Sequence, residues 1–307
     1  PAMAEIYLDD MLPPEPGYML KNPDLAKAMR LIAEQGPDAF YKGEIGQKIV
    51  DAIQAGGGFM TMEDLAEYKA LVRWPARGSY RGYEIISAGP PVGGATVIQA
   101  LNIMENFDLP SMDYLSAQSV HITAEALKRA YADNREYIGD PNFDFVPLYE
   151  LLSKDYARER AFEIPLDSMT PMKEIVPGDF SASKLIAATG TEGGYESPST
   201  THISVVDKDH NMVALTQTIS SFFGAAVMAP GTGIVLNNEM ANFSSPGAPV
   251  NTLEAGKRMR TLISPTLVLK DGQPFLTIGT PGAARIISTV TILLSNIIDY
   301  GMASGSH

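Results

Sequence analysis

The sequence predicts an α+β protein in which helices come first, strands follow and one apolar helix comes last. Three patterns support this class: apolar residues at helical spacing through the opening third, alternating polar and apolar residues between 201 and 279, and an apolar run at 286–298. The chain has 307 residues, of which 45% are hydrophobic, so we expect a large buried core.

Three amphipathic helices are expected in the opening third. Residues 24–36 begin with an acidic residue and end at a glycine, and residues 44–55 are followed by three glycines. Residues 61–68 begin with Thr-Met-Glu-Asp, which is a capping box with Asp64 in the acidic position.

The next pattern is a strand at 81–88, a glycine- and proline-rich turn at 89–94 and a helix at about 95–106. A turn of this kind can bind an anion at the helix N-terminus, but a purely structural turn is the better interpretation.

The longest helical pattern covers residues 116–138 and contains His121, with Glu125 four residues later on the same face. Two candidate ligands without an identifiable third do not make a metal site. We therefore expect a side-chain pair or a packing histidine at this position.

Residues 153–199 are polar and rich in Pro, Gly, Ser and Thr, which is typical of a mobile surface linker. From Thr201 the residues alternate as in a half-buried strand, residues 207–211 supply a turn, and a second strand starts at Met212. The pattern predicts a hairpin with the hydroxyls of Thr200 and Thr201 at its start. Two β-branched residues there are ordinarily only strand formers.

Strand patterns return at 266–270 and 274–279, joined by Asp271-Gly272, a strong hairpin signal. The segment 279–285 then leads into the apolar run at 286–298. That run is interrupted by polar residues and too short to span a bilayer, so we expect a core helix. No internal repeat of 20 to 50 residues is present.

Composition and motif searches exclude several classes of function. A net charge of −13 argues against nucleic acid as a partner, and the absence of cysteine removes disulfides, thiolate metal sites and cysteine nucleophiles. The sequence has no G-x-S-x-G elbow and no Walker A motif. His202 and His210 lack the further ligands of a zinc site, and Asp207 and Asp209 are most simply solvated or bonded to the backbone of a turn.

The hairpin segment 200–209, Thr-Thr-His-Ile-Ser-Val-Val-Asp-Lys-Asp, resembles the cleavage-site signature of the gamma-glutamyltranspeptidases, a family of N-terminal nucleophile hydrolases. Other segments resemble family landmarks in family order, so that the likeness covers the chain from about residue 20 to 302. These segments are 36–43, 63–65, 80–83, 130–133, 139–141, 236–238, 263–266 and 279–282.

This resemblance implies a four-layer αββα sandwich, with Thr200 as the first residue of a central strand after self-cleavage between Ser199 and Thr200. Residues 1–199 would be the heavy-chain portion, shortened at its N-terminal side, and residues 200–307 the light-chain portion, shortened at its C-terminal side. The two would stay associated as one domain. A deliberate fragment and a shortened natural or engineered relative are both open, since residues 1–4 resemble a cloning scar and residues 303–307 the root of a tag.

The resemblance also implies the catalytic residues. After cleavage the α-amine of Thr200 can serve as the general base for its own hydroxyl. Thr218 matches a residue that supports that hydroxyl, and the backbone N–H groups of Gly282 and Ala283 match the oxyanion hole. Neither a metal nor another cofactor is needed.

Several pocket residues depart from the family pattern. Asn242 stands where many members have an Asp that holds the substrate ammonium, and Glu239, where a Gln is common, can restore part of that charge. The segment Thr261-Leu262 replaces a pair of serines that grips the α-carboxylate, and Ser220 replaces a common Asn. Residues 243–260 also form a shorter loop than the lid-bearing loop of many members.

Three functions are therefore expected as alternatives. The first is hydrolysis and transpeptidation of γ-glutamyl amides such as glutathione. The second, favoured by Asn242 and Leu262, is an acylase for glutaryl-type amides that lack the α-ammonium. The third is an inactive, uncleaved scaffold or fragment that binds a partner. Family members are commonly periplasmic, secreted or extracellular.

Overall fold

The computed structural model describes residues 2–180 and 199–303, and these residues form two compact units. One unit comprises Pro1–Val72 and Ser221–Asn238, and the other comprises Arg73–Ser220 and Glu239–His307. Part of the expected mobile linker at 153–199, namely residues 181–198, lies outside the described residues.

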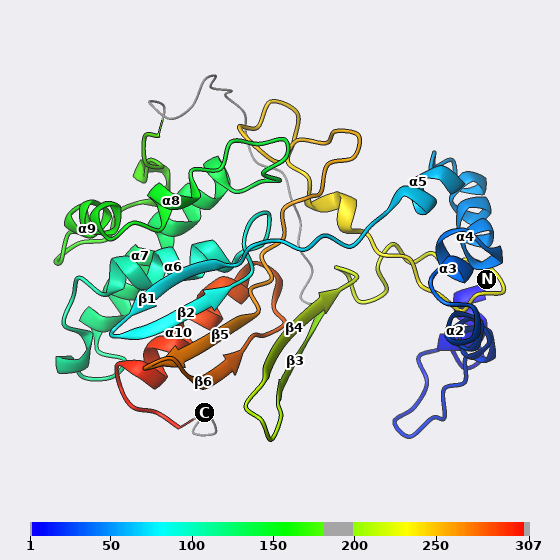
Figure 1. Cartoon of the computed structure of the whole chain (residues 1–307), viewed down its shortest axis with the longest axis horizontal. Coiled ribbons are helices and arrows are strands. Elements are labelled where there is room, and N and C mark those ends of the chain that lie inside the picture. The colour runs from blue at the N-terminus through cyan, green and yellow to red at the C-terminus, as the bar shows by residue number, and fades with distance from the viewer. Residues whose placement is uncertain (1, 181–198, 304–307) are drawn as a thin grey trace. The chain divides into compact units, whose positions relative to one another are not determined.

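The smaller unit is helical in its described part (Figure 1). Its helices are α1 (Ala2–Tyr7), α2 (Pro23–Gln35), α3 (Asp38–Tyr41), α4 (Glu44–Ala55) and α5 (Met62–Glu67). The predictions for α2, α4 and α5 are confirmed, and both hydrogen bonds of the Thr61–Asp64 capping box are present. α3 was not predicted, because four residues are too few for a periodic pattern.

The larger unit contains the described strands and the remaining helices (Figure 1). Its elements are β1 (Ala76–Tyr80), β2 (Tyr83–Ser87), α6 (Gly94–Met104), η1 (Leu109–Ser111), α7 (Ala117–Tyr137), α8 (Leu148–Leu151), α9 (Lys154–Phe162), η2 (Met172–Glu174), β3 (Thr200–Val206), β4 (Met212–Thr218), η4 (Glu239–Asn242), β5 (Thr266–Lys270), β6 (Gln273–Ile278), η5 (Ala283–Arg285) and α10 (Ile286–Ile298).

Four of these strands form one antiparallel sheet in the order β1-β2-β5-β6. Two-residue turns, Arg81-Gly82 and Asp271-Gly272, join its hairpins, and all four turn residues have positive φ, as tight hairpin turns require. Strand β2 pairs with β5 along its whole length, so that Ile85 lies opposite Val268 and both are fully buried. The sheet therefore joins segments from before and after residue 200.

The main core lies where α6 packs against the four-stranded sheet and helices α7, α9 and α10. Every residue of α6 is buried. A Cβ built on Gly78 in β1 would lie 2.3 Å from Cγ2 of Ile98, so only glycine permits this close approach of helix and strand. Helix α10 occupies the residues that the apolar run predicts.

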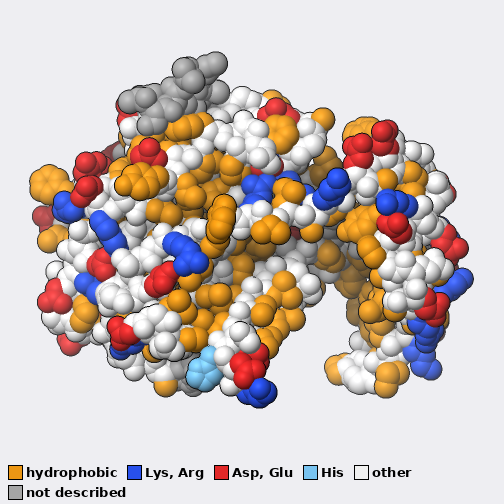
Figure 2. Space-filling model, viewed as in Figure 1, with side chains coloured by type: hydrophobic (Ala, Val, Ile, Leu, Met, Phe, Trp, Pro, Cys, Tyr) orange, Lys and Arg blue, Asp and Glu red, His pale blue; other side chains and the backbone are white. Residues whose placement is uncertain are grey.

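Strands β3 and β4 form a separate two-stranded sheet. One face of this hairpin contacts the four-stranded sheet, and there the hydroxyl of Ser204 donates to the carbonyl of Thr277 at 3.2 Å. The opposite face carries exposed apolar side chains, namely those of Ile203, Val205, Val213 and Leu215, with exposed fractions of 44, 48, 52 and 46%. Figure 2 shows hydrophobic side chains along this hairpin and charged side chains at its turn.

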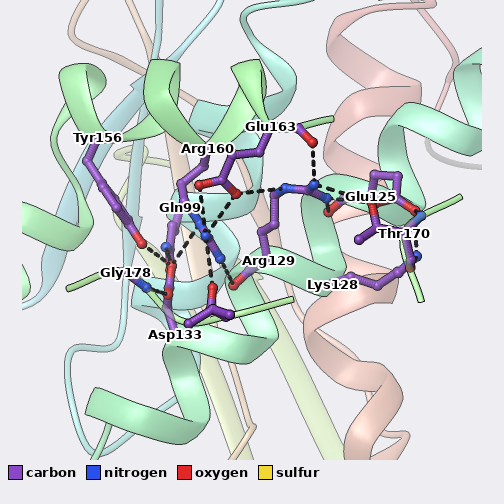
Figure 3. Close-up of polar contacts among 11 residues, drawn as sticks. Gln99, Glu125, Lys128, Arg129, Asp133, Tyr156, Arg160, Glu163, Thr170 and Gly178 are labelled. Atoms are coloured by element: carbon purple, nitrogen blue, oxygen red, sulfur yellow. Dashed lines mark hydrogen bonds and ion pairs between the residues drawn. The ribbon is translucent and has the colours of Figure 1, made fainter. Parts of the chain in front are cut away.

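A buried polar network joins α7 and α9 to the segment 170–178 (Figure 3). Asp133 accepts hydrogen bonds from Tyr156 at 2.7 Å and from the backbone N–H of Gly178 at 2.8 Å. Helix α9 corrects the prediction of an irregular linker from 153 onward. Its charged residues obscure any apolar periodicity, and one of them, Arg160, is buried in this network.

His121 and Glu125 do not pair with each other, so of the two expected alternatives the structure favours the packing histidine. His121 Nε2 lies 2.7 Å from the carbonyl oxygen of Pro165, whereas Glu125 is paired with Lys128 and Arg129. Across residues 2–180 and 199–303, no three His, Asp or Glu side chains are placed to hold a metal ion. In the same residues no helix is long and apolar enough to cross a membrane.

Candidate active site

The hairpin places Thr200, the first residue of β3, directly opposite Thr218, the last residue of β4. A small pocket beside them is lined by polar and apolar residues from four further segments of the larger unit. The lining residues are Thr200, Thr218, Ser220, Glu239, Asn242, Thr261, Ile263, Ala283 and Ile286. Its volume is about 10 Å³, close to the space of a single water molecule.

The peptide bond between Ser199 and Thr200 is in direct contact with Thr218. The Thr218 hydroxyl donates a hydrogen bond of 2.9 Å to the carbonyl oxygen of Ser199, and the backbone N–H of Ser220 donates to the same hydroxyl at 2.8 Å. The second bond orients and polarises the hydroxyl. This arrangement can stabilise negative charge that develops on the Ser199 carbonyl oxygen during attack on its carbon.

Ser220 holds this hydroxyl from a left-handed backbone conformation, with φ of 70°, although it is not a glycine. The residue is 4% exposed. Such strain persists only where the surrounding structure enforces it, and it is common at functional sites.

A second group of donors lies at the start of η5. Ala283 lines the pocket with φ of 53°, and Gly282 precedes it with φ of 142°. Within the described part of the chain, the N–H groups of both residues lack a hydrogen-bond acceptor. The turn is anchored by a hydrogen bond of 2.6 Å from the Tyr131 hydroxyl to the carbonyl of Ala284. These two donors are available to an oxyanion.

Glu239 and Asn242 form the polar end of the pocket on η4. Asn242 Nδ2 donates to Glu239 Oε2 at 2.6 Å, and Asn242 is 7% exposed. Among the described residues, Asn242 Oδ1 has no hydrogen-bond partner, although it is buried. Burial raises the pKa of Glu239, and the hydrogen bond from Asn242 opposes that shift. The pocket thus offers one neutral acceptor and one carboxyl group.

The turn at 89–94 holds Thr261 at the pocket. The N–H of Thr261 donates to the carbonyl of Pro91 at 3.0 Å, and the N–H of Gly93 donates to the carbonyl of Ile263 at 3.0 Å. Leu262 does not line this pocket and packs against the main core instead. Ile263 and Ile286 line it in addition to the predicted residues. Alternation along the extended segment after Thr261 is the signal that would have indicated Ile263.

Comparison with known proteins assigns the chain to a family of enzymes. The family model described as gamma-glutamyltranspeptidase matches residues 1–305. A glutathione hydrolase proenzyme of Escherichia coli K12 is 44% identical over 97% of this chain and 51% of its own length. An acylase ACY 1 proenzyme of Pseudomonas sp. SE83 is 39% identical over 99% of this chain and 52% of its own length. The chain spans about half the length of the curated relatives it matches.

Solved structures give the same assignment. The cephalosporin acylase from Bacillus halodurans matches with a TM-score of 0.84 and 29% identity, covering 98% of this chain and 51% of that one. The gamma-glutamyltranspeptidase of Helicobacter pylori matches with a TM-score of 0.56 and 40% identity, covering 58% of this chain and 51% of that one.

Proposed function

The chain belongs to the gamma-glutamyltranspeptidase family, and on this premise we propose that it is a self-processing threonine amidohydrolase and acyltransferase for γ-glutamyl amides such as glutathione. The observation that carries the proposal is the hydrogen bond of 2.9 Å from the Thr218 hydroxyl to the carbonyl oxygen of Ser199. The names of the relatives support it, because the hydrolase and the acylase are both called proenzymes.

In self-cleavage, the hydroxyl oxygen of Thr200 attacks the carbonyl carbon of Ser199. The oxyanion that forms is stabilised by the Thr218 hydroxyl. The C–N bond then breaks, the nitrogen of Thr200 takes up a proton, and an ester joins Ser199 to the Thr200 side chain. Water hydrolyses this ester, which leaves a carboxylate on Ser199 and a free α-amine on Thr200.

In turnover, that amine is the general base for the Thr200 hydroxyl, which attacks the amide carbonyl of the substrate. The N–H groups of Gly282 and Ala283 stabilise the oxyanion, the amine product leaves, and an acyl-enzyme remains. Water resolves it by hydrolysis, and an amine resolves it by transpeptidation. Cleavage comes first, since a pocket of about 10 Å³ cannot hold an acyl group while Ser199 is attached.

A glutaryl-type acylase is the second candidate, and Asn242 favours it. A neutral amide accepts a hydrogen bond from a substrate ammonium but gives no charge attraction. Glu239 favours the γ-glutamyl substrate when it is ionised. Comparison of the hydrolysis rates of γ-glutamyl-p-nitroanilide and glutaryl-p-nitroanilide decides between them, and a strong preference for the glutaryl compound would refute the γ-glutamyl assignment.

The proposal includes the predicted division at residue 200. The portions 1–199 and 200–307 stay associated because β2 pairs with β5 and because α6 and α10 share one core. We also infer the four-layer sandwich, in which a further helical layer covers the apolar outer face of β3 and β4. That face is exposed in the described residues.

Intact-mass spectrometry tests self-cleavage directly. The chain should convert from 33.0 kDa into two species, the smaller of which begins at Thr200, and Thr200→Ala should abolish the conversion. A chain that stays intact indefinitely would support the third alternative, an inactive scaffold. Cleavage that persists in Thr200→Ala would exclude Thr200 as the nucleophile.

A further inference from the structure

Asn251 lies in the loop 243–260, between the pocket residues Asn242 and Thr261. Its side chain is fully buried. Its Nδ2 donates to the carbonyl of Asn242 at 2.8 Å, and its Oδ1 accepts from the N–H of Arg260 at 2.6 Å. One side chain therefore connects the two ends of the loop, each adjacent to a pocket residue.

The backbone of Asn251 reinforces this connection. Its carbonyl accepts from the N–H of Ser244 at 2.8 Å, and its Nδ2 also lies 3.2 Å from the Ser244 hydroxyl. The residue has φ of 61°, a left-handed conformation that asparagine tolerates better than most residues. Both the side chain and the backbone conformation suit asparagine at this position.

The backbone of Asn251 is bonded to a buried ion pair between Asp144 and Lys257. The N–H of Asn251 donates to Asp144 Oδ2 at 3.2 Å, and Asp144 Oδ1 is 2.8 Å from Nζ of Lys257, whose side chain has no exposed area. Asp140 accepts from the N–H of Arg258 at 3.0 Å. The loop is thus fixed to the segment that follows α7.

We infer that Asn251 is a positioning residue of the acyl-donor pocket, by which we mean the pocket beside Thr200 and Thr218. Asn251 sets the separation of Asn242 and Thr261 and so controls which acyl group is selected. This inference rests on the proposed function. Asn251 has no hydrogen bond to the cleavage residues Thr200 and Thr218 in the described structure. Donor binding should therefore depend on Asn251 much more than self-cleavage does.

Two variants separate the side chain from the backbone. Asn251→Gly removes the connection while permitting positive φ without steric cost. Asn251→Asp keeps an oxygen that accepts from the N–H of Arg260, but it replaces Nδ2 with a second oxygen that faces the carbonyl oxygen of Asn242. Two acceptors then face each other, so the effect of Asn251→Asp on KM should be at least as large as that of Asn251→Gly. Thr252→Ala is the matched control, because that side chain points to Glu254 in an exposed contact.

The test combines kinetics with hydrogen exchange on the full chain. In Asn251→Gly, KM for γ-glutamyl-p-nitroanilide should rise and kcat/KM should fall about tenfold, which corresponds to about 1.4 kcal/mol. The ratio of γ-glutamyl to glutaryl hydrolysis should change. Self-cleavage should stay within about threefold of the wild-type rate, since donor-site positioning is not part of that step. Amide exchange should increase in 239–244 and 260–262 but not in α7, and Thr252→Ala should match the wild type.

The inference would be overturned if Asn251→Gly left both KM and the ratio of γ-glutamyl to glutaryl hydrolysis unchanged. A loss of self-cleavage in both Asn251 variants would also overturn it, since such a loss would indicate a general folding role. A wild-type chain that neither cleaves itself nor hydrolyses γ-glutamyl-p-nitroanilide would instead refute the proposed function. Exchange in 239–244 and 260–262 then still decides whether Asn251 positions these segments.

Discussion

Replacement of Thr218 by valine tests the proposed self-cleavage most directly. Valine keeps the β-branched shape that suits the end of β4 and removes only the hydroxyl that contacts the carbonyl of Ser199. It also leaves the N–H of Ser220 without its acceptor. The fold should survive, because this loss costs about 1–3 kcal/mol in a buried setting.

The expected effect on the rate follows from the geometry. Loss of one preorganised donor to a developing oxyanion costs about 2.7–4 kcal/mol, or about a hundredfold to a thousandfold in rate. Thr218 is half-buried, so water can partly replace its hydroxyl, and we expect about a hundredfold slower cleavage. Thr218→Ser keeps the hydroxyl and loses only rotamer preference, so it should cleave within about tenfold of the wild-type rate.

The assay is a time course of intact mass at fixed pH, with the fraction of uncleaved 33.0 kDa chain fitted to a single exponential. Circular dichroism and thermal unfolding of both variants serve as the control for folding. Wild-type cleavage rates in a folded Thr218→Val protein would refute the role of this hydroxyl as the oxyanion donor.

Three further outcomes are expected. Asn242→Asp places a second carboxyl group beside Glu239, whose Oε2 lies 2.6 Å from Nδ2 of Asn242. The added negative charge should raise the ratio of γ-glutamyl to glutaryl hydrolysis by about tenfold. An unchanged ratio would exclude this end of the pocket from selection of the acyl group. Gly282→Ala introduces a side chain at φ of 142° and should lower kcat, because the strained backbone displaces the oxyanion donors. Ala283→Gly at φ of 53° should leave kcat unchanged, because glycine adopts this conformation freely. Equal kcat values for the two variants would argue against this oxyanion hole. Burial raises the pKa of Glu125, but the hydrogen bonds from Lys128 and Arg129 lower it by more. The net effect is a pKa of about 2, compared with the ordinary value of 4.5. Ionised Glu125 therefore stabilises the fold above pH 4.5, and this contribution is lost as the pH falls toward 2; Glu125→Gln should reduce the difference in melting temperature between pH 7 and pH 3, and an undiminished difference would contradict this.

The predicted elements that the structure confirms have local causes. Helix α4 follows from apolar spacing and the glycines after it, and the β5–β6 hairpin follows from Asp271-Gly272. Helix α9 was missed because charged residues dominate its sequence, and its buried Arg160 is paired with Asp133, which lies far away in the sequence. Its buried face holds only Tyr156, Ala157 and Ala161 beside Arg160, which is too little apolar periodicity to detect.

The same distinction holds for the candidate site. Sequence alone determined the hairpin, since alternation on both sides of a polar turn implies two paired strands, and resemblance to a family indicated which hydroxyls on them matter. Only the tertiary structure decided that Thr218 contacts the carbonyl of Ser199, that Ile263 rather than Leu262 lines the pocket, and that Asn251 connects Asn242 to the segment before Thr261. Local patterns record the preferences of neighbouring residues, whereas these contacts arise from packing between distant segments, which leaves no periodic signal in a single sequence.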